Sequence, residues 1–222
     1  MTSAMIGRRQ LMLGSASLCG LLLAGCATTN GPVAVASTTP VVPPDVLAMY
    51  AARPEEQFPV PAVQLNFLEP RFYRQEMADP TGELPGTVVV ETANRYLYLV
   101  RENGRALRYG VGIGRDGFAW AGRARIAYKR AWPKWTPPAE MIERQPELEQ
   151  YRYGMPPGTD NPLGARALYI FQNGRDTLYR LHGNGDVHSI GKAVSSGCVR
   201  LLHQDVIDLY ERVPDGSPIL VV

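Results

Sequence analysis

From residue 86 onward, short runs of apolar residues alternate with polar ones and are separated by turn-forming glycines, asparagines and prolines. Alternation with a period of two residues is typical of β-strands that bury one face. Asn-Gly pairs at 103–104 and 173–174 predict tight hairpin turns between such strands. The pattern predicts strands at 88–91, 96–101, 106–113 and 123–130, in the hairpin 167–183, and at 217–222.

A helical period is present near the C-terminus. Apolar residues recur there at helical spacing: Val206, Ile207, Leu209, Tyr210 and Val213. They predict an amphipathic helix over 203–213, and a second, short helix is expected near 139–143. We therefore expect a mostly β fold, a sandwich or a partly closed barrel, with one or two helices.

The remaining segments are punctuated by proline. Residues 132–163 carry many prolines and two tryptophans, and we expect a lid or a substrate-binding loop. The alternative is a surface elaboration that packs its own tryptophans. Residues 45–85 predict an irregular arm packed on the domain, and residues 27–44, rich in small residues, Thr and Pro, predict a flexible tether. The globular domain is expected at 86–222.

Residues 1–26 have the pattern of an export signal, with Arg8 and Arg9 followed by an apolar run and small residues. Paired arginines fit a twin-arginine signal, although ordinary secretion signals also carry them. The stretch "LAGC" that ends at Cys26 resembles a lipobox, in which the cysteine is lipid-modified and becomes the first mature residue. Cleavage after "AVA" at 34–36 is the alternative. We expect a lipid anchor on Cys26 and a place on the periplasmic side of the bacterial envelope.

Charge and cysteine content change together when this signal is removed. The chain has 23 basic and 21 acidic residues, which gives no reason to expect nucleic acid as a partner. Without residues 1–26 the basic residues fall to 21, equal to the acidic ones. Cys19 is discarded, and Cys26 is lipid-modified or discarded. Cys198 is then the only free thiol of an exported domain.

Cys198 therefore has no partner for an intramolecular disulfide. A metal site needs several ligands at suitable spacing, which His182, His188 and His203 do not offer, so we expect no metal and no cofactor. An inert buried cysteine and a reactive thiol remain as alternatives. The small, polar neighbours in "SSGC" suit an exposed turn and favour the reactive thiol.

A thiol with an ordinary pKa of about 8.5 needs a base or a cation beside it to act as a nucleophile. His182 ends a predicted strand and is the expected base, and Gly183 would let the chain turn sharply after it. The main-chain amides of Gly197 and Cys198 are the expected donors to an oxyanion. Arg200 would lower the thiol pKa or hold a carboxylate. Each residue alone has an ordinary structural explanation, but together they favour a Cys-His dyad.

The run "GVGIGRDG" at 110–117 has a glycine spacing that superficially matches a nucleotide-binding loop. It follows a hairpin, and no clear helix is predicted after it, so this interpretation is weak. Close backbone packing or a bulge is the better explanation of these glycines.

The stretch "YRLHGNGDVHSIGKAVSSGCVRLLHQDVIDLY" resembles the L,D-transpeptidases, the YkuD-type catalytic domain of enzymes that modify bacterial peptidoglycan. Their signature is a histidine and a glycine, a loop, and then [S/T]-H-G-C-x-[N/R]. The resemblance covers roughly 86–222 and implies a β-sandwich-like catalytic domain. It makes Cys198 the nucleophile and His182 its base, oriented by the carbonyl of Gly183.

The same resemblance assigns the residues around the nucleophile. Gly197 and Cys198 would supply the oxyanion amides, and Ser195, Ser196 and Arg200 would contact the substrate. Ser196 stands where the family usually has histidine. We expect this departure to alter loop rigidity and substrate placement without abolishing activity.

The implied reaction begins with attack of Cys198 on the bond between the diamino acid and the terminal D-alanine of a tetrapeptide stem. The resulting thioester passes to an amine of another stem or of an envelope protein, and carbapenems are expected as covalent inhibitors. Water as acceptor would make the protein an L,D-carboxypeptidase. A peptidoglycan endopeptidase of the NlpC/P60 type is an alternative, although its cysteine precedes its histidine. A non-catalytic envelope-binding lipoprotein is another.

Overall fold

The structure is a computed structural model that describes residues 42–115, 120–195 and 197–222. The predicted export signal with Cys26 and nearly all of the predicted tether lie outside these residues, and so does Ser196. None of the helices among the described residues has the length and apolar character needed to cross a membrane.

The described strands form a sheet of nine strands and a smaller one of two. In spatial order the larger sheet contains β1 (Gln75–Ala78), β4 (Arg105–Gly110), β3 (Tyr96–Arg101), β2 (Val88–Glu91), β11 (Pro218–Val221), β6 (Gly122–Ala131), β7 (Arg166–Gln172), β8 (Arg175–Asn184) and β10 (Val199–Leu202). The smaller sheet pairs β5 (Ile113–Gly114) with β9 (Ala193–Ser195). The α-helices are α1 (Pro44–Met49), α2 (Ala139–Arg144) and α3 (His203–Arg212). Short 3₁₀ turns lie at Leu65–Phe67, Pro70–Phe72, Pro146–Tyr151 and Val187–Ser189.

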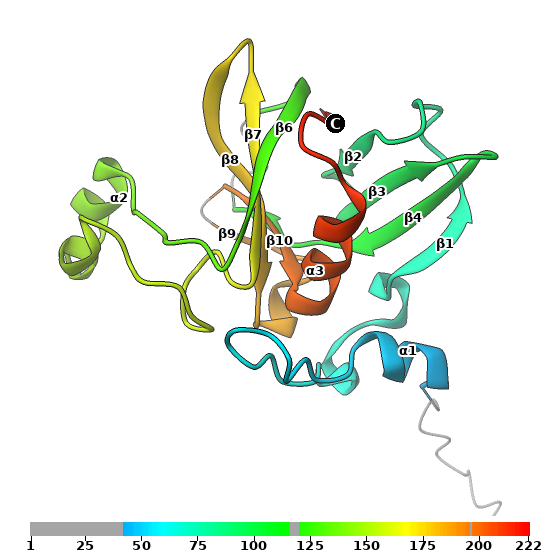
Figure 1. Ribbon diagram of the computed structural model, residues 1–222, viewed down its shortest axis with the longest axis horizontal. Helices are drawn as coiled ribbons and strands as arrows, with labels where there is room; N and C mark the ends of the chain where they lie inside the picture. The colour runs from blue at the N-terminus through cyan, green and yellow to red at the C-terminus, as the bar shows by residue number, and fades with distance from the viewer. Residues whose placement is uncertain (1–41, 116–119, 196) are drawn as a thin grey trace, which may run out of the picture. The chain divides into compact units, whose positions relative to one another are not determined.

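Figure 1 shows β6, β7 and β8 on one side of α3 and β2, β3 and β4 on the other. The main core joins α3 to both parts of the sheet through fully buried apolar side chains, among them Val88, Leu97, Ile170, Leu181 and Leu209. Most neighbouring strands are antiparallel, but β11 runs parallel to β2 and β10 runs parallel to β8. The prediction of a mostly β fold with few helices is confirmed.

Both predicted hairpin turns are present. Asn103 and Gly104 have φ values of 60° and 66°, and Asn173 and Gly174 have 52° and 74°. Two successive positive φ values are what a tight turn matched to the twist of its strands requires. The Asn-Gly pairs therefore set the register of β3 with β4 and of β7 with β8.

The predicted strand at 106–113 is divided. β4 ends at Gly110, and the chain then moves away to form β5, which pairs with β9 instead. A Cβ at Gly110 would lie 2.6 Å from the Cβ of Phe72, and one at Gly112 would lie 2.4 Å from the carbonyl oxygen of Ser189. Close backbone packing is confirmed as the reason for these glycines.

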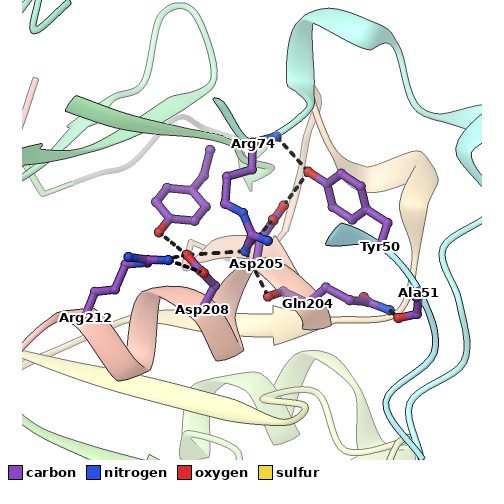
Figure 2. Close-up of polar contacts among 8 residues, drawn as sticks. Tyr50, Ala51, Arg74, Gln204, Asp205, Asp208 and Arg212 are labelled. Atoms are coloured by element: carbon purple, nitrogen blue, oxygen red, sulfur yellow. Dashed lines mark hydrogen bonds and ion pairs between the residues drawn. The ribbon is translucent and has the colours of Figure 1, made fainter. Parts of the chain in front are cut away.

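The segment predicted as an irregular arm contains two regular elements, α1 and β1. β1 extends the sheet by pairing antiparallel with β4, and Tyr50, just after α1, is almost fully buried. Figure 2 shows how the arm is held against the first turn of α3. Tyr50 donates to Asp205 at 3.2 Å, and the side-chain amide of Gln204 donates to the carbonyl of Ala51 at 3.1 Å. The arm is thus fixed to α3 by buried polar contacts.

The proline-rich segment at 132–163 packs on this same arm. Trp132 is buried against Phe58, and its indole N–H donates to Glu56 at 2.9 Å. The side-chain amide of Asn161 donates to the carbonyl of Pro133 at 3.2 Å and so ties the two ends of the segment together. Trp132 therefore packs against the arm and not within its own segment.

Candidate active site

Strands β8 and β10 run parallel, and this pairing brings the predicted catalytic residues together. Arg200 pairs in register with His182, and Val199 pairs with Leu181. Cys198 lies one residue before β10, so it falls opposite Arg180, on the face of the sheet that His182 shares. The sequence predicted a dyad of His182 and Cys198, but it did not predict the parallel strand that brings the two residues together.

The Cys198 thiol is half-buried, and its Sγ lies 3.9 Å from the main-chain carbonyl oxygen of Leu178, to which it can donate. Leu178 has a φ of 64°, a conformation that non-glycine residues rarely adopt. Burial raises the pKa of Cys198 above its ordinary value, while the amide of Arg180 and the guanidinium groups of Arg180 and Arg200 lower it to a smaller extent. The thiol is therefore protonated at neutral pH and needs a base when it attacks.

His182 is buried near the end of β8, and its Nδ1 lies 2.9 Å from the carbonyl oxygen of Gly183. An N–H at Nδ1 that donates to this oxygen leaves Nε2 free to accept a proton. Burial lowers the pKa of His182 to about 4, although the carbonyls of Gly183 and Pro162 raise it. The imidazole is thus neutral at neutral pH, as a general base must be. No hydrogen bond joins it to Cys198, and both residues lie within the described part of the chain.

Ser195 shapes the turn that carries the thiol. Its buried hydroxyl donates to the carbonyl oxygen of Cys198 at 2.6 Å and accepts the amide of Gly197 at 3.2 Å. Gly197 has a φ of 129°, in the region that favours glycine. The sequence predicted Ser195 as a substrate contact and the Gly197 amide as an oxyanion donor. Both groups are engaged with each other in this structure, so Ser195 is placed to position the turn.

Arg200 is half-buried, and its Nε is buried without a hydrogen-bond partner among the described residues. Burial lowers the pKa of Arg200, and the neighbouring charge of Asp186 raises it to a smaller extent. A guanidinium is a donor group suited to a carboxylate, although this Nε itself is shielded from solvent. Binding of an anion by Arg200 stays a prediction of the sequence.

His203, the first residue of α3, belongs to the site and was missed by sequence reasoning. It is buried, its Nδ1 accepts the amide of Ala165 at 3.3 Å, and burial lowers the pKa of His203 to about 4. A Cβ at Gly183 would lie 2.8 Å from Nδ1, and a Cβ at Gly164 would lie 2.4 Å from Cε1. The ring of His203 therefore occupies the space where side chains at both glycines would stand.

This packing also corrects the prediction of a sharp turn at Gly183. β8 continues through Gly183 to Asn184, so the chain does not turn there. Glycine is required because His203 fills the space beside it. The amide of Gly183 also donates to the carbonyl of Leu163 at 3.1 Å. The only sequence signal for this arrangement is a histidine at the start of the predicted helix, which identifies no contact.

The described residues include no group of three or more histidine, cysteine, aspartate and glutamate side chains placed to hold a metal ion. What they do place together is a half-buried thiol, a neutral imidazole on the same face of the sheet, and guanidinium groups. A thiol and a base in this arrangement suit nucleophilic attack on a carbonyl, and the guanidinium groups suit an anionic substrate.

The sequence profile of the L,D-transpeptidase catalytic domain (YkuD) matches residues 85–221. The chain is 35% identical over 148 residues to the probable L,D-transpeptidase YbiS of Escherichia coli K12, and 34% identical over 153 residues to the probable L,D-transpeptidase ErfK/SrfK of the same organism. These matches take in 64% and 67% of this chain but 46% and 47% of the two relatives. The chain thus spans about half the length of the curated relatives it matches.

One solved structure similar to this chain is that of a probable carnitine operon oxidoreductase, caia, from Brucella melitensis. The two are 42% identical with a TM-score of 0.50, and the match covers 72% of this chain and 99% of the other. The word oxidoreductase is part of the name of the Brucella protein and is not applied to this chain.

Proposed function

Because this chain belongs to the L,D-transpeptidase catalytic-domain family, we propose that it transfers the acyl group of a peptidoglycan stem peptide through a thioester on Cys198. The donor is a tetrapeptide stem, cleaved between its diamino acid and its terminal D-alanine. The acceptor is an amine of another stem or of an envelope protein. The observation that carries this proposal is the parallel pairing of β8 with β10, which sets the thiol on the same face as a neutral, buried imidazole.

In the first step the thiol turns from the carbonyl of Leu178 toward His182, whose Nε2 takes its proton. The sulfur attacks the donor carbonyl, and the Cys198 amide donates to the oxyanion that forms. The carbon–nitrogen bond then breaks, and the imidazolium gives its proton to the departing D-alanine. The neutral resting state of both groups suits this order of events, since the pKa of the thiol is raised and that of the imidazole is lowered.

In the second step an acceptor amine attacks the thioester and gives a proton to His182. The carbon–sulfur bond breaks, and the proton returns to the sulfur, so the enzyme is regenerated. Arg200 would hold a carboxylate of the substrate through its guanidinium. Water as acceptor would use the same residues and give a carboxypeptidase.

The site would act on the periplasmic side of the envelope, with the protein held by a lipid on Cys26. Both statements rest on the sequence pattern of residues 1–26, and acyl labelling that is lost in Cys26→Ser would test them.

The test is D-alanine release from a tetrapeptide stem by the full chain, with intact mass recorded after exposure to a carbapenem. We expect a covalent adduct and D-alanine release from the wild type. Cys198→Ala should show no adduct and lose release by at least about 10⁴-fold, because the nucleophile is absent. Its unfolding midpoint should stay within about 1 °C of the wild type, since the substitution removes only one half-buried sulfur.

His182→Gln is the variant matched to Cys198→Ala, because it keeps the thiol and removes the base. A carbapenem adduct that forms equally well in Cys198→Ala would refute the assignment of the nucleophile. Release of D-alanine without any transfer to an added amine would identify the carboxypeptidase.

A further inference from the structure

Strands β6, β7, β8 and β10 present one continuous face on the side of the thiol. Its side chains follow from the strand registers: Arg125, Tyr128 and Arg130 on β6, Ala167, Tyr169 and Phe171 on β7, Asp176, Arg180 and His182 on β8, and Arg200 on β10. The opposite face carries core residues such as Leu168 and Leu181, against which α3 packs. We call the first of these the cysteine-side face.

One row of this face runs straight to the nucleophile. Tyr128 pairs with Tyr169, Tyr169 pairs with Arg180, and Arg180 lies opposite Cys198. The rings of Tyr128 and Tyr169 are stacked with their centroids 4.4 Å apart, and the guanidinium of Arg180 lies 4.4 Å from the centroid of Tyr169. At the far end the guanidinium of Arg130 lies 5.1 Å from the centroid of Tyr128. The row is therefore a stack of two rings between two guanidinium groups.

The two ends of this stack differ in charge compensation. Arg180 is neutralised by Asp176, to which it makes two hydrogen bonds of 2.7 Å. Arg130 is exposed, and no ion pair within residues 42–222, apart from the undescribed positions, involves it. Stacking holds its guanidinium in place while the edge stays open to a carboxylate. A group ordered before binding loses little entropy when a ligand arrives.

The span of the row matches part of the proposed donor. Three strand spacings of about 4.8 Å separate β6 from β10, so Arg130 lies roughly 14 Å from the thiol across the sheet. The matching part of the donor has a similar length. It consists of two extended residues joined by a peptide link through a side chain, which adds methylenes, and of a carboxylate with its hydrogen bond. Together these parts cover roughly 14 Å. The acidic residue two places before the cleaved bond of a stem peptide can therefore reach Arg130 while its carbonyl lies at Cys198.

We propose that the row from Tyr128 to Arg180 is the donor-binding subsite, and that Arg130 binds the free carboxylate of the glutamate in the stem peptide. The peptide crosses the strands over the tyrosine edges. This inference rests on the proposed function and deepens it, because it names which chemical feature of the donor the enzyme selects.

The experiment compares two donors, a tetrapeptide stem whose glutamate carboxylate is free and the same stem with that carboxylate amidated. The wild type should have a lower KM for the free acid. Arg130→Gln should raise the KM for the free acid by about ten-fold, the size expected for one lost charge-assisted contact, and leave its kcat within about two-fold. The KM for the amidated donor should be unchanged, because that donor never engages the guanidinium.

Arg101→Gln is the matched control, since Arg101 is an exposed arginine at the end of β3, on the other part of the sheet. It should leave both donors unaffected. Equal changes for both donors in Arg130→Gln, or no change for either, would overturn the proposal while D-alanine release by the wild type kept the proposed function intact. No release of D-alanine by the wild type from either donor would remove the proposed function and this inference with it.

Discussion

The first turn of α3 borders two polar regions that are built in opposite ways. Toward the arm, opposite charges face one another: Arg74 lies 3.6 Å from Asp205 and 3.3 Å from Asp208 (Figure 2). Toward β8 and β10, Arg200 keeps a buried Nε without a partner, and the thiol of Cys198 has a single long contact of 3.9 Å. The first set of contacts holds the arm on α3, whereas the second surrounds the groups proposed to act on the substrate. The two regions should therefore respond differently to mutation, one in stability and the other in activity.

The largest effect is expected on the arm side. Arg74→Met removes the guanidinium that faces Asp205 and Asp208 and leaves the buried Asp205, which ionises above about pH 7, without its cationic neighbour. We expect the free energy of unfolding to fall by about 3–5 kcal/mol, measured by urea titration. Activity per folded molecule should change little, because Arg74 lies outside the cysteine-side face.

Arg71→Met is the control for this change. Arg71 pairs with Glu69 at 2.9 Å, and its guanidinium lies 4.5 Å from the centroid of the Phe72 ring, but the Arg71 and Glu69 side chains are exposed, so the loss of Arg71 should cost no more than about 1 kcal/mol. Comparable losses in the two variants would contradict the distinction between the buried cluster and ordinary surface pairs.

The next effect concerns pH. Burial raises the pKa of Asp205 from 3.8 to about 7, even though Arg74 and Tyr50 lower it. A folded-state pKa above the unfolded value means that the folded protein holds this proton more tightly, so the stabilisation is present below pH 4 and is lost as pH rises to 7. Asp205→Asn cannot ionise, and its stability relative to the wild type should rise across this range by on the order of 2–4 kcal/mol.

The stability that the catalytic region contributes should change with pH in the opposite direction. The pKa values of His182 and His203 are lowered to about 4, so their contribution to stability is present above pH 6.5 and is lost as pH falls toward 4. Urea titrations at several pH values separate the contribution of Asp205 from that of the two histidines, since Asp205→Asn changes only the contribution of Asp205. A stability difference between Asp205→Asn and the wild type that stayed constant from pH 4 to 7 would show that the carboxyl does not titrate in this range.

The sequence predicted those parts of the molecule whose signals are local. Alternating apolar residues and Asn-Gly turns define β2, β3, β7 and β8, and the helical period defines α3. β9 and β10 were missed because they are short and lie next to small polar residues, and because β9 pairs with β5, which is distant in the sequence. The elements α1 and β1 were missed because prolines obscure them and because their stability comes from contacts with α3 and β4.

The candidate site divides in the same way. The resemblance to the L,D-transpeptidase family is confirmed, and it rests on the residues around His182 and Cys198, which are recognisable by residue type. Their catalytic roles stay predictions. Other features depend on packing in three dimensions: the hydrogen bonds of Ser195 within its own turn and the fit of His203 against Gly183. Residue spacing predicts neither of them.

His203 lies between the two regions and gives the finest test of the comparison. It starts the helix that the arm holds, but its ring touches the strand end that orients His182. His203→Ala leaves a cavity beside Gly183, which lets the carbonyl that contacts the His182 imidazole shift. We expect kcat for D-alanine release to fall about ten-fold, a typical cost for a misplaced catalytic group, with KM nearly unchanged. His203→Asn should recover most of kcat, because its side-chain oxygen can still accept the amide of Ala165. If both variants lost stability but kept kcat, His203 would belong with the arm cluster and not with the active site.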